Sequence, residues 1–496
     1  MLKKPFFGIS SSAFLIFFNA LFLWIFFSLF RQALDTADMF ENYAWGITWT
    51  LGNNKHPPLF SWVTAFWFQI FPTKDWAYYL LNEFNLLIAL AFIMLSMRKV
   101  LDEDKVFIAL GLTIVVLPLG IDNGYRYNAN LAQLPFLTGY LWALLTAFTE
   151  KRISIFCLAG VFAGAAVLSK YSAIVLISAI TFATFLYFKP KLTYVLPRLL
   201  LTGLIALTVL SPHIYWGVQH GWPSLHYMHQ MYRPVEQGEW FSIIVNRLRI
   251  LFTYVASSLA MLGIALLYPP NFIKTTPLVY RRKIPLGLLI FISSVICIFI
   301  ASYIEKITPY SGWFIVCSIF FGWALVDMLP DVTNWKMLRP RIKLLIIFYI
   351  TLVTLVTIYK KLNTENTYVP LAALPEIVSK DVTNLYHNAY NKHIDYVAGS
   401  FPLPYAISFY SSDHPYGIYG LDIEQSNWIN KSQFKLKSKV IICNKEKHYS
   451  PTDPECTQQA IALFGSPDIH KNLKYQVYDP VLKASRYVEV NVLMYP

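Results

Sequence analysis

The chain has 496 residues, of which 56% are hydrophobic, 17% are aromatic and only 14% are charged. This composition excludes an ordinary soluble globular protein and favours one with many membrane-spanning segments. The formal net charge is +13, but the Lys and Arg residues of the short loops concentrate on one predicted side of a membrane. Topology therefore explains the charge without a nucleic-acid partner.

Apolar runs of about 17 to 22 residues recur as far as residue 360, with short charged loops between them. Such runs predict α-helices, because the strands of a membrane β-barrel would alternate over about ten residues. The first run, residues 9–30, is too long for a signal peptide and lacks a small-residue cleavage site, so we expect an uncleaved span with a cytoplasmic N-terminus. About eleven spans are expected: 9–30, 76–97, 106–120, 131–148, 153–169, 171–188, 197–215, 249–268, 285–303, 312–329 and 343–360.

The first loop, residues 31–58, carries three acids. Asp35, Asp38 and Glu41 are spaced three residues apart, so in a helix they would share one face. The aromatic residues beside them, Phe40, Tyr43, Trp45 and Trp49, are typical of a membrane–water interface. An ordinary polar loop with aromatic anchors is the alternative.

Residues 57–71 are apolar but too few to cross a bilayer, and Pro57-Pro58 prevents the helix from extending further toward the N-terminus. Treating this segment as a span would invert every later loop. We therefore expect a juxtamembrane helix lying in the interface.

Further polar groups are predicted on the same outer side as the first loop. Arg126-Tyr-Asn128-Ala-Asn130 lies in a hairpin between two spans, and Lys170 interrupts an apolar helical hairpin, where a lysine is costly unless it reaches water or an anion. Snorkelling of Lys170 to the interface is the structural alternative. Arg247 and Arg249 open a later span, but at most one of them is expected to face a site.

Residues 361–496 are polar and mixed in charge, which predicts a separate small α/β domain after a membrane domain of residues 1–360. Runs at Lys439–Cys443 and Tyr487–Leu493 are expected strands. If this domain is periplasmic, Cys443 and Cys456 could form a disulfide, the alternative being two free thiols. His226-x-x-His229, in the loop before residue 240, is a weak metal signal, so no dedicated metal site is expected.

Acids and cations on one face of a membrane suit a lipid-linked phosphate substrate. Cations would hold the anionic group at the interface, while a carboxylate would act as general base on an incoming hydroxyl. Because the leaving lipid phosphate is a stable anion, no strong general acid is needed. No cofactor is expected, and assistance by a divalent ion is left open.

Four motifs in order resemble the membrane-embedded GT-C glycosyltransferases, which include protein O-mannosyltransferase-like enzymes and lipid A aminoarabinose transferases. The similarity covers about residues 30–265. The motifs are Asp38 with the Lys55-His56-Pro57-Pro58-Leu59 corner, Arg126-Tyr-Asn128-Ala-Asn130, Ser169-Lys170-Tyr171, and Ser211-Pro212-His213 with Trp216. The resemblance implies an all-α polytopic GT-C membrane domain with juxtamembrane helices and a small C-terminal α/β periplasmic domain.

The resemblance also implies inverting transfer of a sugar from a polyprenyl-phosphate donor to an acceptor such as lipid A or lipopolysaccharide core, at the periplasmic face of a bacterial inner membrane. Asp38 matches the catalytic aspartate and Lys170 the donor-phosphate lysine. Met39 stands where the pattern usually has Glu, so Asp35 or Glu41 is expected to supply the second acid. The other candidate residues are Arg126, Arg247 and Arg249 for the phosphate, and Lys55, His56, Tyr127, Asn128, Asn130, Tyr171 and His213 for the substrate pocket.

Two alternatives stay open. A protein O-glycosyltransferase would have the same fold with a peptide acceptor. A transporter or flippase of a lipid-linked precursor would need charged groups at mid-membrane, where the spans carry almost none, Glu83 lying toward the outer end of its helix.

Overall fold

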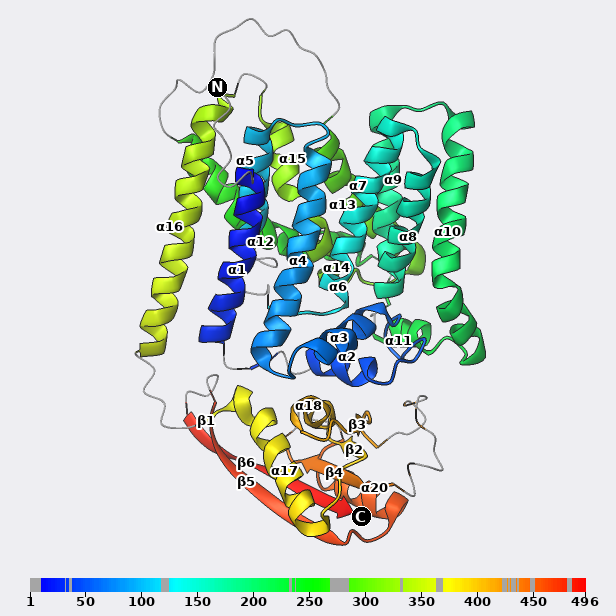
Figure 1. The fold of residues 1–496 in the computed structure, drawn as a ribbon, viewed down its shortest axis with the longest axis vertical. Helices are drawn as coiled ribbons and strands as arrows, with labels where there is room; N and C mark the ends of the chain where they lie inside the picture. Colours follow the sequence, from blue (N-terminus) through cyan, green and yellow to red (C-terminus); the bar gives the residue numbers. More distant parts are fainter. Residues whose placement is uncertain are drawn as a thin grey trace, which may run out of the picture. The chain divides into compact units, whose positions relative to one another are not determined.

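The computed structural model forms two compact units (Figure 1), which are described in turn. The first contains Met1–Phe27, Lys55–Pro57 and Tyr79–Ile358, and the second Ser28–Asn54, Pro58–Tyr78 and Tyr359–Pro496. The residues that the structure describes are 10–31, 33–34, 38–116, 125–231, 234–236, 238–267, 285–330, 333–362, 369–421, 426, 429, 434, 437–446, 451–479 and 484–496.

The first unit is a bundle of helices, most of which form from the apolar runs of the sequence. Its helices are α1 (Ser11–Phe30), α4 (Asp75–Met97), α5 (Glu103–Ile114), α6 (Ala129–Ala132), α7 (Leu134–Glu150), α8 (Ile153–Ser169), α9 (Ala173–Phe188), α10 (Leu192–Gln219), α11 (Pro223–Met231), α12 (Trp240–Leu266), α13 (Leu286–Glu305), α14 (Ser311–Ser318), α15 (Phe321–Met328) and α16 (Trp335–Leu362). The fold class predicted for this part of the chain is confirmed.

Within the described residues, seven helical segments are long and apolar enough to cross a membrane: Ser11–Phe30, Asp75–Met97, Ala129–Glu150, Leu192–Gln219, Trp240–Leu266, Leu286–Glu305 and Trp335–Tyr359. An eighth candidate is the pair α14 and α15, which bends by 55° at its break. The expected count of about eleven is not confirmed, because α8 and α9 are shorter apolar helices and α5 has only 12 residues.

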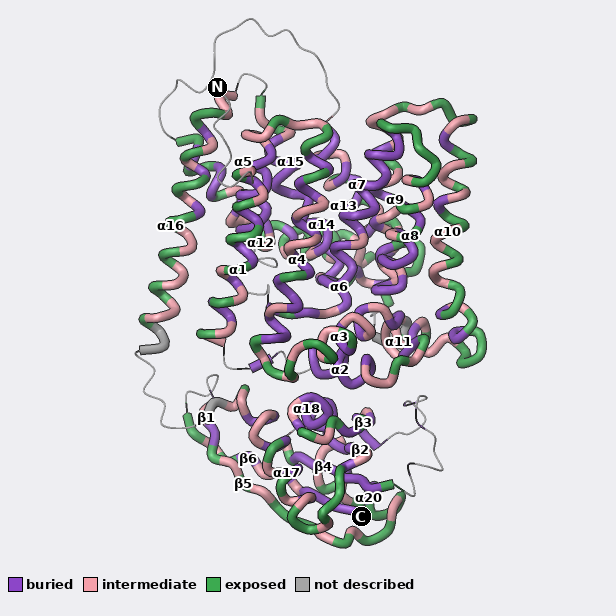
Figure 2. Tube along the Cα trace, in the orientation of Figure 1, coloured by how far each residue is buried: buried purple, intermediate pink, exposed green. Residues whose placement is uncertain are grey.

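Burial separates central from peripheral helices in this unit (Figure 2). The span that contains α7 has 89% of its apolar window buried, whereas α10 and α16 have 11% each. Exposed Leu and Ile side chains are favourable on such outer helices in a membrane, because lipid tails are as apolar as these side chains. Leu200, Leu204 and Leu207 of α10 are exposed in this way.

Two glycines allow α8 to approach α10 closely. A Cβ at Gly160 would lie 2.5 Å from the carbonyl oxygen of Thr202, and one at Gly164 would lie 2.7 Å from the Cβ of Val209. Small residues four positions apart on one face are a common device for helix packing in membranes. The Thr202 hydroxyl also donates to the Phe156 carbonyl at 3.0 Å, which adds a hydrogen bond between the same two helices.

The second unit joins two segments from the start of the chain to the C-terminal region. Helices α2 (Asp38–Gly46) and α3 (Leu59–Ile70) belong to it. At 12 residues α3 is about 18 Å long, too short for a span, as the sequence predicts. The C-terminal elements are β1 (Val369–Pro370), the 3-10 helix η2 (Leu371–Ala373), α17 (Leu374–Tyr390), β2 (Tyr396–Gly399), α18 (Leu403–Tyr410), β3 (Tyr416–Gly417), β4 (Lys439–Asn444), α20 (Glu455–Phe464), β5 (Ile469–Asp479) and β6 (Ala484–Tyr495).

A six-stranded mixed sheet organises this C-terminal region, with the order β1-β5-β6-β4-β2-β3. β4 is buried on both faces: Val440 and Ile442 face the core formed with α17 and α18, while Ile441 and Cys443 face the core formed with α20. The alternation follows from the two-residue period of a strand. The predicted small α/β domain is therefore present, with β4 and β6 where strands are expected.

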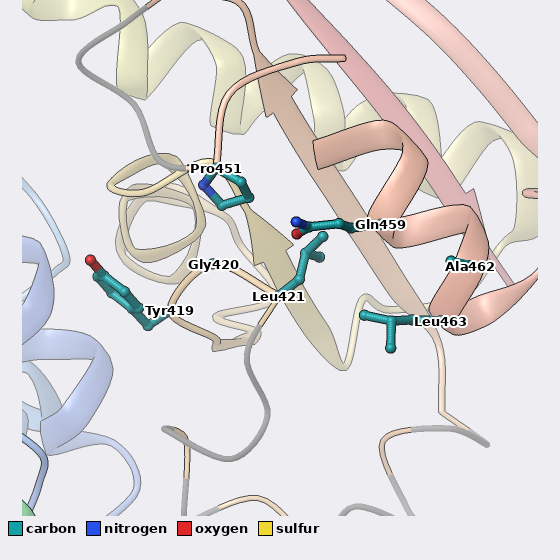
Figure 3. Close-up of a pocket in the computed structure, with 7 residues that line it drawn as sticks. All are labelled: Tyr419, Gly420, Leu421, Pro451, Gln459, Ala462 and Leu463. Atoms are coloured by element: carbon teal, nitrogen blue, oxygen red, sulfur yellow. The ribbon is translucent and has the colours of Figure 1, made fainter. Parts of the chain in front are cut away.

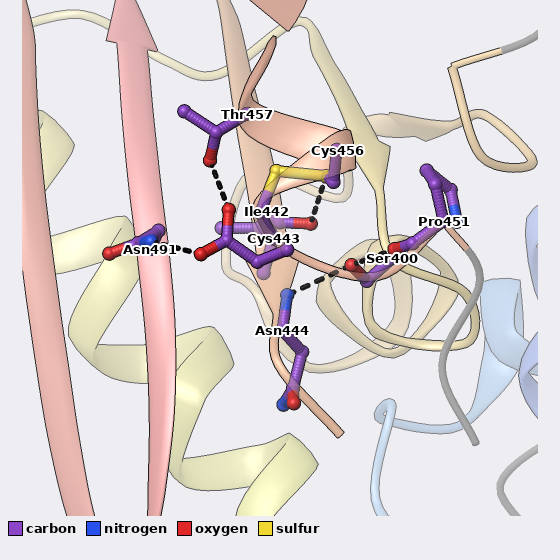
Figure 4. The surroundings of a disulfide bond; sticks show 9 residues. Ser400, Ile442, Cys443, Asn444, Pro451, Cys456, Thr457 and Asn491 are labelled. Atoms are coloured by element: carbon purple, nitrogen blue, oxygen red, sulfur yellow. Dashed lines mark hydrogen bonds between the residues drawn. A yellow bond between two sulfur atoms is a disulfide. The ribbon is translucent and has the colours of Figure 1, made fainter. Parts of the chain in front are cut away.

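Cys443 of β4 and Cys456 of α20 form a disulfide (Figure 4). Beside them the carboxylate of Asp453 accepts hydrogen bonds from Thr457 and from Asn491 of β6. These links fix α20 against the sheet.

Candidate functional site

The acidic segment of the first loop forms the start of α2. Asp38 and Glu41 both lie in its first turn, where the partial positive charge of the helix N-terminus favours carboxylates. Asp38 is exposed, whereas Glu41 is only 3% exposed. Asp35 lies outside the described residues. The two described acids thus meet different surroundings despite their spacing.

The buried side of α2 packs against α18 within the second unit. The ring of Phe40 lies 5.4 Å from that of Tyr410, and the ring of Tyr43 lies 5.2 Å from that of Phe409. Edge-on aromatic pairs of this kind stabilise an interface beyond the area they bury. Three of the four aromatic residues expected at a membrane interface, Phe40, Tyr43 and Trp45, are therefore buried in protein, while Trp49 is exposed.

Trp45 and Tyr405 add a polar link to this packing. The Trp45 indole Nε1 donates to the Tyr405 hydroxyl at 3.3 Å. Burial, and then the negative charge of Glu41, raise the pKa of Tyr405 well above its usual value, so this phenol stays protonated. The buried Glu41 therefore affects the ionisation of Tyr405 on α18, whereas Asp38 is exposed.

In the first unit, Lys170 follows the last residue of α8 and turns inward. Its side chain is 6% exposed, and its Nζ donates to the Asn130 Oδ1 of α6 at 2.6 Å. The same Nζ lies 5.4 Å from the ring centroid of Tyr310, within cation–π range. Asn128 fixes the backbone at Asn130, because its side-chain oxygen caps α6 by accepting hydrogen bonds from the Asn130 and Leu131 amides. The structure thus brings the predicted Lys170 and Asn130 together.

The Lys-His-Pro-Pro corner contributes two more groups to the first unit. Burial, followed by the charges of Lys170 and Lys55, lowers the pKa of His56 well below its usual value. The residue as a whole is half-buried. The Lys55 ammonium lies 5.5 Å from the ring centroid of Tyr227. His56 is therefore a neutral imidazole in a region of positive potential.

Tyr171, the neighbour of Lys170, has two hydrogen-bonding partners. Its hydroxyl lies 2.6 Å from the Nε2 of His213 and 2.8 Å from the hydroxyl of Ser224. The His213 ring stacks on Trp216 one turn further along α10, with centroids 5.7 Å apart. The predicted Tyr171 and His213 therefore form one network, which fixes the turn that carries Lys170.

The remaining predicted residues differ in burial. Arg126 is exposed, and its Nε donates to the hydroxyl of its neighbour Tyr125 at 2.8 Å. Tyr127 is buried. Arg247 is half-buried near the start of α12, and Arg249 is exposed. A role for these arginines in holding phosphate stays a prediction.

A pocket of about 470 Å³ opens in the C-terminal region (Figure 3). Its lining contains none of the predicted site residues: Tyr419, Gly420, Leu421, Pro451, Gln459, Ala462 and Leu463. The lining is mostly apolar and carries no acid or base, so it suggests no chemistry.

Sequence reasoning missed four residues of these networks, Tyr310, Ser224, Tyr227 and Tyr405. Each is a Tyr or Ser in a stretch with many similar residues, so only tertiary contacts distinguish them. The potential metal ligands His387, His393 and Asp413 also left no signal, because Asp413 lies 26 and 20 positions from the two histidines.

Comparison with known proteins adds two findings. Residues 55–216 match the family model described as dolichyl-phosphate-mannose-protein mannosyltransferase. Two crystal structures of ArnT from Cupriavidus metallidurans, one bound to undecaprenyl phosphate and one in the apo state, superpose with a TM-score of 0.58. Each is 14% identical to this chain, and the alignment covers 96% of this chain and 97% of the ArnT chain. No curated protein sequence matches.

The matched segment contains the Lys-His-Pro-Pro corner, Asn130, Lys170 and His213, which are among the residues that suggested the resemblance, whereas Asp38 lies outside it. Residues 55–216 thus match the mannosyltransferase family model, and the chain as a whole has the fold of ArnT, which confirms the resemblance to the GT-C membrane glycosyltransferases.

Proposed function

We propose that this protein is an inverting glycosyltransferase of a bacterial inner membrane, which moves a sugar from a polyprenyl-phosphate donor to lipid A or another envelope glycan. The donor class is supported by the fold shared with a transferase crystallised with undecaprenyl phosphate. The reaction would occur at the periplasmic face, with the N-terminus in the cytoplasm and the C-terminal domain in the periplasm. That orientation agrees with the distribution of loop cations.

The observation that carries the proposal is the buried ammonium of Lys170. It is held by a neutral amide and an aromatic ring, and its positive charge acts on His56 together with that of Lys55. Burying a cation is costly, and a region of positive potential attracts a phosphate group. We propose that this cluster binds the donor phosphate.

In the proposed reaction, the Asp38 carboxylate accepts the proton of an acceptor hydroxyl. The hydroxyl oxygen attacks the anomeric carbon, and the bond from that carbon to the phosphate oxygen breaks with its electron pair going to the phosphate. The configuration at the anomeric carbon is inverted. Because the donor phosphodiester becomes a monoester with about one more negative charge, Lys170 binds the product side of the reaction more strongly and so lowers the barrier.

Replacing Asp38 by Asn tests the base. In a deletion strain that carries the Asp38→Asn variant, mass spectrometry should show lipid A and core glycans without the added sugar, although protein levels match the parent. Glu376→Gln is the matched control, because Glu376 forms a surface ion pair with Lys380, and its loss should leave the modification intact. Near-normal modification by the Asp38→Asn variant would remove Asp38 from the role of base.

A protein acceptor is the second candidate, because the matching family model describes a protein mannosyltransferase. Mass spectrometry of periplasmic proteins and of lipid A from parent and deletion strains separates the two acceptors. A glycan lost from proteins while lipid A is unchanged would favour the protein acceptor.

A further inference from the structure

Three potential metal ligands meet in the second unit, at residues that the proposed reaction does not use. His387 lies in the last turn of α17, His393 in the loop that follows it, and Asp413 in the turn after α18. One ligand atom from each lies within 4.8 Å of the others. Asp413 Oδ1 is 2.9 Å from the His393 Nδ1, and Asp413 Oδ2 is 2.8 Å from the His387 Nε2.

The carboxylate of Asp413 is held in place before any ion binds. Its side chain is fully buried, and its Oδ2 accepts from the Ile394 amide at 2.8 Å. The His387 Nε2 is nearly equidistant from the two carboxylate oxygens, at 2.8 and 3.0 Å. A single N–H cannot align well with both oxygens, whereas a cation between the three side chains satisfies both imidazoles and the carboxylate.

The site is open on one side. The His393 side chain is 84% exposed and the His387 side chain 35% exposed, so water can reach the ion and complete its coordination. Two imidazole nitrogens and one carboxylate oxygen suit Zn²⁺, whereas Ca²⁺ and Mg²⁺ prefer oxygen ligands alone. We propose that His387, His393 and Asp413 bind a zinc ion.

Such an ion would tie the end of α17 to the turn after α18. The next residue in that turn, His414, lies 5.9 Å from the Tyr43 ring of α2 and contacts the Ser408 carbonyl of α18 through its Nδ1 at 3.1 Å. The ion would therefore brace the turn on which α2 packs. This is a structural role, and the proposal does not rest on the transfer reaction.

The test uses the full-length protein in detergent, stripped of metal with a chelator and titrated with Zn²⁺. Elemental analysis after desalting and the melting temperature report binding. His393→Ala is the informative variant, because this exposed side chain can be removed without disturbing the core. His470→Ala is its matched control, since His470 is also an exposed histidine of the same region but lies on β5.

We expect the parent and the His470→Ala variant to retain one equivalent of zinc and to melt at a higher temperature with it. His393→Ala should weaken binding by at least about 100-fold, because even indirect partners of a metal commonly contribute 10- to 100-fold. Asp413→Asn should also lose the ion. If the parent binds no zinc, or if His393→Ala binds as the parent does, the three residues form only a hydrogen-bonded network. Loss of zinc on His226→Ala alone would likewise overturn the proposal.

Discussion

The Trp45 indole donates a hydrogen bond to the Tyr405 hydroxyl, and so joins two residues that lie 360 positions apart in the chain. Around this bond, α2 packs its aromatic face on α18, and Glu41 lies close enough to affect the Tyr405 pKa. The helix that carries the proposed base is therefore supported from the C-terminal region.

Removing the hydroxyl with Tyr405→Phe should reduce stability by about 1–3 kcal/mol, because the buried Trp45 Nε1 loses its hydrogen bond to this hydroxyl. Thermal unfolding of the full-length protein checks this. A double-mutant cycle with Trp45→Phe should give a coupling of at least about 0.5 kcal/mol. Tyr487→Phe is the control, since Tyr487 is exposed. Equal effects of the two Tyr→Phe changes would show that the link contributes nothing.

Lys170→Met should reduce kcat/KM for the polyprenyl-phosphate donor roughly 10- to 150-fold, the equivalent of a charged hydrogen bond of about 1.5–3 kcal/mol. Asn130→Ala should act in the same direction but less strongly, because Asn130 only orients the ammonium. Transfer kinetics in membranes or detergent measure both effects. Lys380→Met, at a surface ion pair, is the control. Unchanged kinetics in Lys170→Met would contradict a role in phosphate binding.

The sequence predicts the parts of the fold that depend on local pattern. The boundaries of α8 fall where its apolar run does, α3 is a short helix because its run is short, and β4 follows a β-branched run. The number of spans was harder to predict, since an apolar run does not reveal that α14 and α15 are separated by a 55° bend. An apolar run predicts that a segment is removed from water, but it does not predict the direction of the helix axis.

The site was also predicted only in part, because local sequence pattern does not reveal contacts with distant parts of the chain. Lys170 stood out because a lysine in an apolar hairpin is costly, and the structure gives it the predicted Asn130 as a partner. By contrast, the spacing of Asp38 and Glu41 suggested a shared face, yet one is exposed and the other is buried beside α18. A partner from the far end of the chain leaves no local signal.

His56 should make the protein less stable in mild acid. Its folded-state pKa lies well below that of the unfolded chain, so the unfolded state takes up the extra proton as the pH falls below about 6.5. Stability should therefore decrease from pH 7 to pH 5. The His56→Gln variant should show a smaller decrease than the parent in melting temperatures measured across this range. His470→Gln should retain the parent dependence, and an identical profile for His56→Gln would contradict the lowered pKa of His56.

Breaking the disulfide should destabilise the C-terminal region. Cys443 and Cys456 are 13 positions apart, and closing a loop of this length stabilises a fold by about 3 kcal/mol through the unfolded state. The Cys443→Ala/Cys456→Ala double variant should therefore melt at a lower temperature than the oxidised parent. Reductant should lower the melting temperature of the parent but leave that of the double variant unchanged, because the other described cysteines, Cys157, Cys297 and Cys317, are free thiols. A parent whose melting is insensitive to reductant, with its thiols shown to be reduced, would mean that the sheet and α20 hold together without the bond.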